Sequence, residues 1–210
     1  MSDIKAVVFD LDGVLIDARE WHYEALNQAL AMFAFTITRA EHLSTYDGLP
    51  TRKKLAKLTT AKGLPEPLHD LISRVKQQCT QSVIADQCRP RFEKEFMLSR
   101  LKASGLKLAV ASNSVRESVK LMLRRSAILD QFDFFLSNED VVDPKPDPEI
   151  YNLAAAKLGL SPHEVVVVED NHYGIQAARA SGCHVIEVEG VDDVSIELMT
   201  AFLTSMGRSL

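Results

Sequence analysis

The chain has 210 residues, of which 46% are hydrophobic and 25% are charged, and it carries a formal net charge of -5. This composition is typical of a globular domain and excludes the disordered, collagenous and membrane-embedded classes of protein. An acidic chain lacks the dense basic surface that binds the nucleic-acid backbone, and no apolar run is long enough to span a bilayer. We therefore expect a small molecule as the main partner, and neither nucleic acid nor membrane.

The start of the chain and its cysteines indicate the compartment. Met1-Ser2-Asp3 leads almost at once into an apolar strand pattern, without the features of a signal peptide. Cys79, Cys88 and Cys183 are too few and too scattered for a disulfide framework or a metal cluster, so we expect them to be reduced and buried. These features predict a cytoplasmic protein, whereas no pattern in the sequence specifies its oligomeric state.

Short apolar runs alternate with helical patterns along most of the chain. The runs that predict strands are Ala6–Phe9 and residues 108–111, 132–136, 165–168 and 185–188. Helical spacing predicts helices over residues 115–123, 150–158 and 173–181, and Ser114 with Glu117 forms a capping-box pattern at the start of the first. Because parallel strands need covering crossovers, this order predicts a doubly wound, Rossmann-like α/β fold with a mainly parallel sheet.

One connection is much longer than a crossover requires. Roughly ninety residues separate the first strand from the run at 108–111, several times the length of an ordinary connection. A helical stripe that includes Leu26 and Leu30 is followed by a break at residues 63–65 and by a second helical pattern, and residues 91–104 predict a helix that returns to the core. We therefore expect a helical cap domain over residues 16–89, inserted into an α/β core formed by residues 1–15 and 90–210.

Polar side chains follow the predicted strands at the points where the strands end. They are Asp10 and Asp12 after the first strand, Ser112 and Asn113 after the second, Lys145 in the loop after the third, and Glu169 and Asp170 after the fourth. In an open parallel sheet ligands bind at this edge. Clustered carboxylates need a cation, and all-oxygen ligation suits Mg²⁺, whereas a lysine and a serine hydroxyl hold phosphate oxygens. The pattern predicts phosphoryl transfer.

These residues form an ordered set of motifs. Asp10-Leu11-Asp12-Gly13, Ser112-Asn113, Lys145-Pro146 and Glu169-Asp170-Asn171 resemble the four motifs of the haloacid dehalogenase superfamily, most closely its β-phosphoglucomutase and phosphoglycolate-phosphatase branch. The resemblance implies that Asp10 attacks phosphorus to form an aspartyl-phosphate, and that Asp12 protonates the leaving oxygen and later activates water. It also implies a Mg²⁺ site formed by Asp10, the backbone carbonyl of Asp12, Glu169 and Asp170. Ser112, Asn113 and Lys145 would hold the phosphoryl group.

The resemblance extends into the inserted segment. Gly48-Leu49-Pro50-Thr51-Arg52 is similar to the substrate loop of the cap in that branch, and His22 matches one of its histidines. This similarity implies substrate contacts by Arg52 and His22. Arg19-Glu20-Trp21 differs from the pattern of the relatives, and so does Ala18, where they often have Ser or Thr.

The second aspartate narrows the reaction. An alkoxide leaving group needs a proton whereas a halide does not, so Asp12 favours phosphate esters over haloacids. We therefore expect a Mg²⁺-dependent phosphatase that hydrolyses a small phosphorylated metabolite. A sugar phosphomutase of the β-phosphoglucomutase type is the nearest alternative, and a noncatalytic binding protein on the same fold is an alternative of another class. The lack of spanning segments excludes a membrane ion pump with the same nucleophile.

Overall fold

The computed structural model describes residues 4–208 and has a five-stranded sheet at its centre. The strands are β1 (Ala6–Phe9), β2 (Lys107–Ala111), β3 (Phe134–Leu136), β4 (Val165–Glu169) and β5 (His184–Glu187). Neighbouring strands are parallel in the order β3-β2-β1-β4-β5, and Val8 of β1 lies between Ala109 of β2 and Val167 of β4. The chain builds outward from β1 first on one side and then on the other, which confirms the predicted doubly wound α/β fold.

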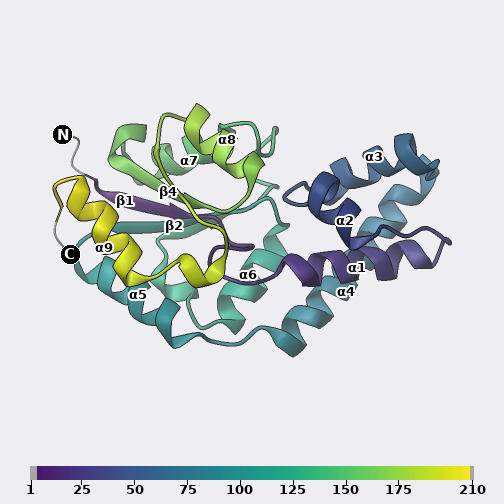
Figure 1. Cartoon of the computed structure of the whole chain (residues 1–210), viewed down its shortest axis with the longest axis horizontal. Coiled ribbons are helices and arrows are strands. Elements are labelled where there is room, and N and C mark those ends of the chain that lie inside the picture. The colour runs from purple at the N-terminus through teal and green to yellow at the C-terminus, as the bar shows by residue number, and fades with distance from the viewer. Residues whose placement is uncertain (1–3, 209–210) are drawn as a thin grey trace.

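Helices cover both faces of the sheet. On one face lie α5 (Phe92–Ala103), α6 (Arg116–Arg125) and α9 (Ile196–Ser205), and on the other lie α7 (Glu149–Leu158) and α8 (His172–Ala180) (Figure 1). Successive strand residues point to opposite faces, so Val7 and Phe9 pack with the first group while Ala6 and Val8 pack with the second. Short 3₁₀ turns occur at Leu129–Gln131, Pro162–Glu164 and Val191–Asp193. Apolar side chains therefore fill both faces of the sheet, and the polar side chains lie beyond the ends of the strands.

The predicted strands and helices of the core lie within two residues of their observed bounds, but two local predictions are wrong. The N-cap of α6 is Val115, whose own side chain makes no capping hydrogen bond. Ser114 instead turns its hydroxyl toward the strand ends, and the Arg116 backbone N–H donates to Glu139 at 2.8 Å. Cys88 and Cys183 are free and buried as expected, whereas Cys79 is partly exposed.

A separate group of helices lies between β1 and β2 in the chain. It consists of α1 (Arg19–Ala31), α2 (Arg39–Glu41), the π-helix η1 (His42–Tyr46), α3 (Thr51–Lys62), the 3₁₀ turn η2 (Glu66–Leu68) and α4 (His69–Gln87). These helices lie beside the sheet rather than over either face (Figure 1). They have an apolar core of their own, in which Leu26, Leu55 and Ile72 are fully buried. We call the predicted range 16–89, which brackets them, the cap segment.

The cap segment packs against the core through α4. This long helix lies along α1 and also reaches α6, where the side-chain amide of Gln77 donates to the hydroxyl of Ser118 at 2.9 Å. The contact holds the inner ends of α1, α3 and α4 above the carboxyl ends of β1, β2 and β4. Within residues 4–208, no helix is both long and apolar enough to cross a lipid bilayer.

Candidate active site

Asp10, at the end of β1, is joined to the lysine of the loop after β3. The Lys145 ammonium donates to Asp10 Oδ1 at 2.6 Å and to the Ala111 carbonyl at 2.9 Å, and it also contacts Glu169 at the end of β4. Burial raises the pKa of Asp10 well above its usual range, and Lys145 opposes that rise while Glu169 adds to it. Although burial alone would lower the pKa of Lys145, Asp10 and Glu169 raise it, so the lysine is a permanent cation in the site.

Three carboxylates of the site are placed to share a cation. Oxygens of Asp10, Glu169 and Asp170 lie within 4.8 Å of one another. Asp170 Oδ1 is buried and has no hydrogen-bond partner among residues 4–208. Burial, followed by the charge of Glu169, raises the pKa of Asp170 to about 7. A buried, unpaired carboxylate oxygen beside two further carboxylates fits a hard divalent ion such as Mg²⁺, because the ion would supply the missing partner and offset the repulsion.

Asp12 is held as a carboxylate by the residues around it. Its Oδ2 accepts from Ser114 at 2.7 Å and from Ser112 at 3.2 Å, and its Oδ1 lies 3.0 Å from Nε2 of His22. Burial would raise the pKa of Asp12, but His22, the Ser114 hydroxyl and Lys76 together lower it to about 2. Lys76 Nζ donates to Nδ1 of His22 at 3.2 Å, which assigns the proton of a neutral imidazole to Nε2, facing Asp12.

Asn113, the other polar residue after β2, bridges the core to the cap segment. Its side-chain amide donates to the Gly48 carbonyl at 2.9 Å, and its Oδ1 accepts from the Lys145 backbone N–H at 3.2 Å. Gly48 has φ +70°, and a Cβ at this position would lie 2.3 Å from Oδ1 of Asn171 in the core. Only glycine fits between these two asparagines, so Gly48 is the point at which the cap segment closes on the sheet.

A second link between cap segment and core runs through Arg19. Its Nη2 donates to Asp170 Oδ2 at 2.7 Å, and its Nε lies 3.3 Å from Asp47 Oδ2 in the loop before α3. Asp47 also accepts from the Asn171 side chain at 3.3 Å. The guanidinium therefore balances the charge of two carboxylates, one on each side of the closure.

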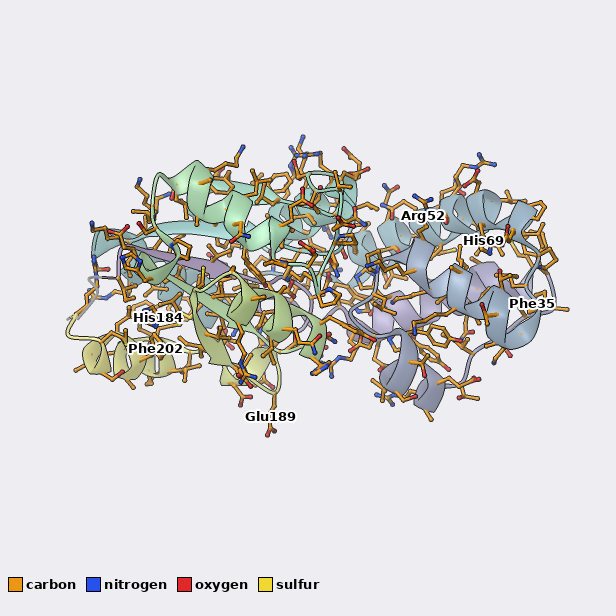
Figure 2. All side chains as sticks on the ribbon, turned by 90° about the horizontal axis from the view of Figure 1, so that it is seen from above. Phe35, Arg52, His69, His184, Glu189 and Phe202 are labelled. Carbon is orange, nitrogen blue, oxygen red and sulfur yellow. The ribbon has the colours of Figure 1, made fainter. Side chains whose placement is uncertain are left out.

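A cavity of about 250 Å³ lies between the cap segment and the strand ends. Its core side is lined by the predicted residues Asp10, Asp12, Asn113, Lys145, Glu169 and Asp170. His22 and Arg52 line it from the cap segment, and Figure 2 shows Arg52 between the core and the outer end of the cap segment, where His69 and Phe35 lie. Arg52 is an exposed residue, so its predicted substrate role remains a prediction. Ser112 is fully buried beside Asp12.

The sequence reasoning missed several residues of this site. They are Arg19, Asp47, Lys54, Lys76 and Ser114. Of these, only Arg19 could have been noticed in the sequence, because Arg19-Glu20-Trp21 differs from the pattern of the relatives. Asp47, Lys54 and Lys76 are ordinary charged residues, and closure of the cap segment brings them to the strand ends. Ser114 lies in the core just after β2, where its hydroxyl was interpreted as a helix cap.

The model of the haloacid dehalogenase-like hydrolase family matches residues 7–188 of this chain. The chain belongs to this family. Over 179 aligned residues it is 30% identical to the phosphorylated carbohydrates phosphatase of Thermotoga maritima. The alignment covers 85% of this chain and 82% of that protein. Among solved structures it is similar to CbbY from Rhodobacter sphaeroides in complex with phosphate, with 27% sequence identity and a TM-score of 0.82. The match covers 89% of this chain and 87% of CbbY.

A further haloacid dehalogenase-like structure, β-phosphoglucomutase from Clostridium difficile, matches with a TM-score of 0.84 over 98% of this chain and all of that one. At 21% identity, this likeness establishes the fold alone. Together, the family and its relatives identify this chain as an enzyme of the phosphatase and phosphomutase type that acts on phosphorylated compounds.

Proposed function

We propose that this haloacid dehalogenase-like enzyme is a Mg²⁺-dependent phosphatase that hydrolyses a small phosphate monoester through an aspartyl-phosphate at Asp10. The observation that supports this proposal most is the cluster of Asp10, Glu169 and Asp170 around an unpaired buried oxygen, with the Lys145 ammonium beside it. A cavity of about 250 Å³ is at the low end for a ligand site, which favours a small metabolite over a nucleotide or a polymer end.

In the first step an oxygen of Asp10 attacks phosphorus. A P–O bond forms to Asp10, the bond to the ester oxygen breaks, and that oxygen leaves with a proton from Asp12. Lys145, Ser112 and Asn113 bind the nonbridging oxygens, on the basis of their place at the strand ends. Asp10, Glu169, Asp170 and the Asp12 carbonyl would hold Mg²⁺, which neutralises charge on the phosphoryl oxygens when bound.

Asp12 must carry a proton in the first step and accept one in the second. The arriving phosphate brings negative charge close to Asp12, which raises the pKa of its carboxyl from the low value set by its neighbours. Once the alcohol has left, the Ser114 hydroxyl and His22 favour the carboxylate again. Asp12 then takes a proton from water, which attacks phosphorus, and the bond to Asp10 breaks to release inorganic phosphate.

Closure of the cap segment supports the same chemistry. Asn113 and Asn171 contact the loop of Asp47 and Gly48 from the core, so the loop seats only when the cap segment lies over the strand ends. A closed site limits bulk water and holds the ester in line with Asp10. A sugar phosphomutase would use the same first step and return the phosphoryl group to another hydroxyl of the substrate, and it would require a bisphosphorylated activator.

The test is phosphate release from a panel of sugar phosphates, phosphoglycolate and nucleotides, with Mg²⁺ or with excess chelator, by wild type and by Asp10→Asn. The matched control is Asp17→Asn, which changes an exposed aspartate of the same loop. We expect Mg²⁺-dependent release by wild type and Asp17→Asn, and none by Asp10→Asn. Substantial turnover by Asp10→Asn would refute the covalent route, and undiminished activity in chelator would refute the metal requirement. Turnover that depends on a bisphosphorylated activator would identify a mutase.

A further inference from the structure

The helix α5 presents two aromatic side chains to solvent. Phe92 is 76% exposed and Phe96 is 44% exposed, and their rings stack with centroids 6.0 Å apart. Single exposed apolar side chains are common on proteins, whereas neighbouring aromatic side chains are enriched where one protein binds another. Figure 1 shows α5 on the outside of the core, with the cap segment at the other end of the molecule. The aromatic pair is therefore remote from the proposed reaction.

The two rings belong to a stripe that runs the length of the helix. Its residues are all exposed and are Phe92, Phe96, Ser99 and Ala103. Steps of four, three and four positions place side chains along one face of a helix, and they are the steps of a coiled-coil seam. The opposite face of α5 packs on the core, where Met97, Leu98 and Leu101 are fully buried. The stripe thus points away from the core and can pack against a second helix.

Charged side chains flank the stripe, and their sign changes from one end of α5 to the other. Glu93 and Glu95 lie in the first turn, and Arg100 and Lys102 lie in the last. Residues seven positions apart point in nearly the same direction, so each side of the stripe has one acidic and one basic residue. Two copies of α5 that pack antiparallel would bring the acidic end of each helix to the basic end of the other. Parallel packing would bring like charges together.

One antiparallel register satisfies the whole stripe. With a twofold axis at the middle of α5, each aromatic ring faces a small side chain of the second copy. The facing pairs are Phe92 with Ala103 and Phe96 with Ser99. The same register brings opposite charges together, and these pairs are Glu93 with Arg100 and Glu95 with Lys102. Self-complementary contacts of this kind are what a twofold interface between identical chains requires.

We propose that the stripe and its flanking charges bind a second copy of this chain, so that the protein forms a twofold-symmetric dimer through antiparallel α5 helices. Stable interfaces bury about 1,200–2,000 Å², more than one pair of three-turn helices provides, so the dimer should dissociate with a Kd of roughly 10–100 µM. The inference does not depend on the proposed phosphatase function. No residue of α5, which is described in full, lines the cavity, so the variants below should keep the wild-type kcat/KM.

The test is sedimentation equilibrium of the full chain from about 1 to 500 µM. Glu93 and Arg100 are the residues to change, because Lys102 already donates to the Asp130 carbonyl of its own chain at 2.7 Å. We expect wild type to pass from monomer to dimer, and Glu93→Arg and Arg100→Glu each to raise the Kd at least about 10-fold by placing like charges together. An equimolar mixture of the two variants should associate again, because one carries only basic and the other only acidic residues at these positions.

The mixture distinguishes an interface from a purely local role of the charges. An acidic first turn and a basic last turn also stabilise a single helix, and in that case charge reversal would lower the melting temperature of each variant and mixing would restore nothing. Arg124→Glu is the matched control, because Arg124 is an exposed arginine in the last turn of α6, and it should dimerise as wild type does. A wild type that stays monomeric throughout or assembles beyond a dimer, or a mixture that does not associate, would overturn the inference.

Phe92→Ser tests the apolar part of the interface. Most of the Phe92 side chain is exposed in the single chain, so the variant should keep the wild-type melting temperature while its Kd rises by roughly 10-fold or more. Met32→Ser is the control, since Met32 is 65% exposed but lies in the cap segment, and it should keep the wild-type Kd. Equal association of Phe92→Ser and wild type would contradict the inference.

Discussion

Arg19 of the cap segment pairs with Asp170 of the core, with Nη2 of the guanidinium 2.7 Å from Oδ2 of the carboxylate. Asp170 is also one of the three carboxylates that are placed to share a cation. The pair therefore joins closure of the cap segment to the charge balance of the proposed metal site. When Mg²⁺ is bound, Asp170 has two cations beside it, and when Mg²⁺ is removed only Arg19 remains close to it.

This arrangement predicts how the thermal stability of the Arg19→Met variant depends on Mg²⁺. Without Mg²⁺ the variant leaves Asp170 uncompensated, so its melting temperature in chelator should fall by several degrees relative to wild type. With Mg²⁺ the difference should shrink, because the ion offsets the same charge. Arg39→Met is the control, since Arg39 pairs with Glu20 on the exposed surface. If the variant's melting temperature falls equally with and without Mg²⁺, Arg19 does not contribute to the charge balance of the metal site.

Gly48 predicts a steric test of closure. Alanine at this position would place a Cβ 2.3 Å from Oδ1 and 2.5 Å from Cγ of Asn171. The loop could not then seat on the core, so Gly48→Ala should lower kcat/KM by roughly 10- to 100-fold, as expected when a reacting group is displaced by about 1 Å.

Gly63 provides a matched control for that variant. It has the same φ of +70°, at the end of α3, but a Cβ there would meet nothing within 4 Å. Gly63→Ala therefore carries the same backbone strain without the clash and should lose stability but not activity. Removing the Asn171 side chain in a Gly48→Ala, Asn171→Ala double variant should recover part of the lost kcat/KM. If both alanine variants lose activity equally, backbone strain rather than closure explains the effect.

Lys145→Met should abolish most of the activity and also destabilise the fold. The ammonium contacts Asp10 at 2.6 Å inside the protein, so its removal leaves buried carboxylates unpaired. Breaking such a pair typically costs about 3–5 kcal/mol, and loss of a preorganised cation lowers kcat by at least about 100-fold. Chemical denaturation and phosphate release measure the two effects. Lys157→Met, which changes an exposed lysine of α7, should do neither.

The sequence predicted the core side of the site because the fold itself brings those residues together. Parallel strands that run in one direction place Asp10, Ser112 and Glu169 at the same edge, whatever the lengths of the connections between them. The role of Lys145 could be predicted only with the family resemblance as well, since a lysine between prolines in a loop has no distinguishing local pattern. The strands were found because residues buried on both faces of a sheet form short apolar runs.

The cap side could not be predicted in the same way. Lys54 and Lys76 lie on different helices, and their place at the cavity depends on how α3 and α4 pack and on how the cap segment closes. The capping-box prediction for Ser114 and Glu117 is wrong because a serine hydroxyl that caps a helix and one that donates to a nearby carboxylate occur in the same local sequence pattern. The Ser114 hydroxyl donates to Asp12 at 2.7 Å, and the first backbone N–H of α6, that of Arg116, donates to Glu139.

His42 predicts how stability depends on pH. Its ring is fully buried, and neither nitrogen has a hydrogen-bond partner among residues 4–208. Burial, assisted by Lys54, lowers its pKa from 6.5 to about 4. Between these values the unfolded chain binds more protons than the folded one, so the free energy of unfolding falls as pH drops from 6.5 toward 4, by about 1–3 kcal/mol.

His42→Phe should flatten that part of the stability curve. Phenylalanine fills the same space beside Tyr23, whose ring centroid lies 5.3 Å away, and leaves no unpaired nitrogen. The variant should be at least as stable as wild type at neutral pH, since it buries no unsatisfied polar group. Urea denaturation at several pH values measures both results. An unchanged slope in the variant would assign the acid sensitivity to other groups.

The most direct test of the central claim is to trap the phosphoryl group on Asp10. Enzyme turning over a phosphate ester with Mg²⁺ is quenched in acid and digested, and the peptides are identified by mass spectrometry. With p-nitrophenyl phosphate, whose leaving group needs no proton from Asp12, Asp12→Ala forms the intermediate but cannot activate water, so the trapped fraction should increase. We predict one phosphoryl group, located at Asp10 and absent from Asp10→Asn. Turnover without any phosphorylated peptide, or phosphorylation at another residue, would contradict the proposed mechanism.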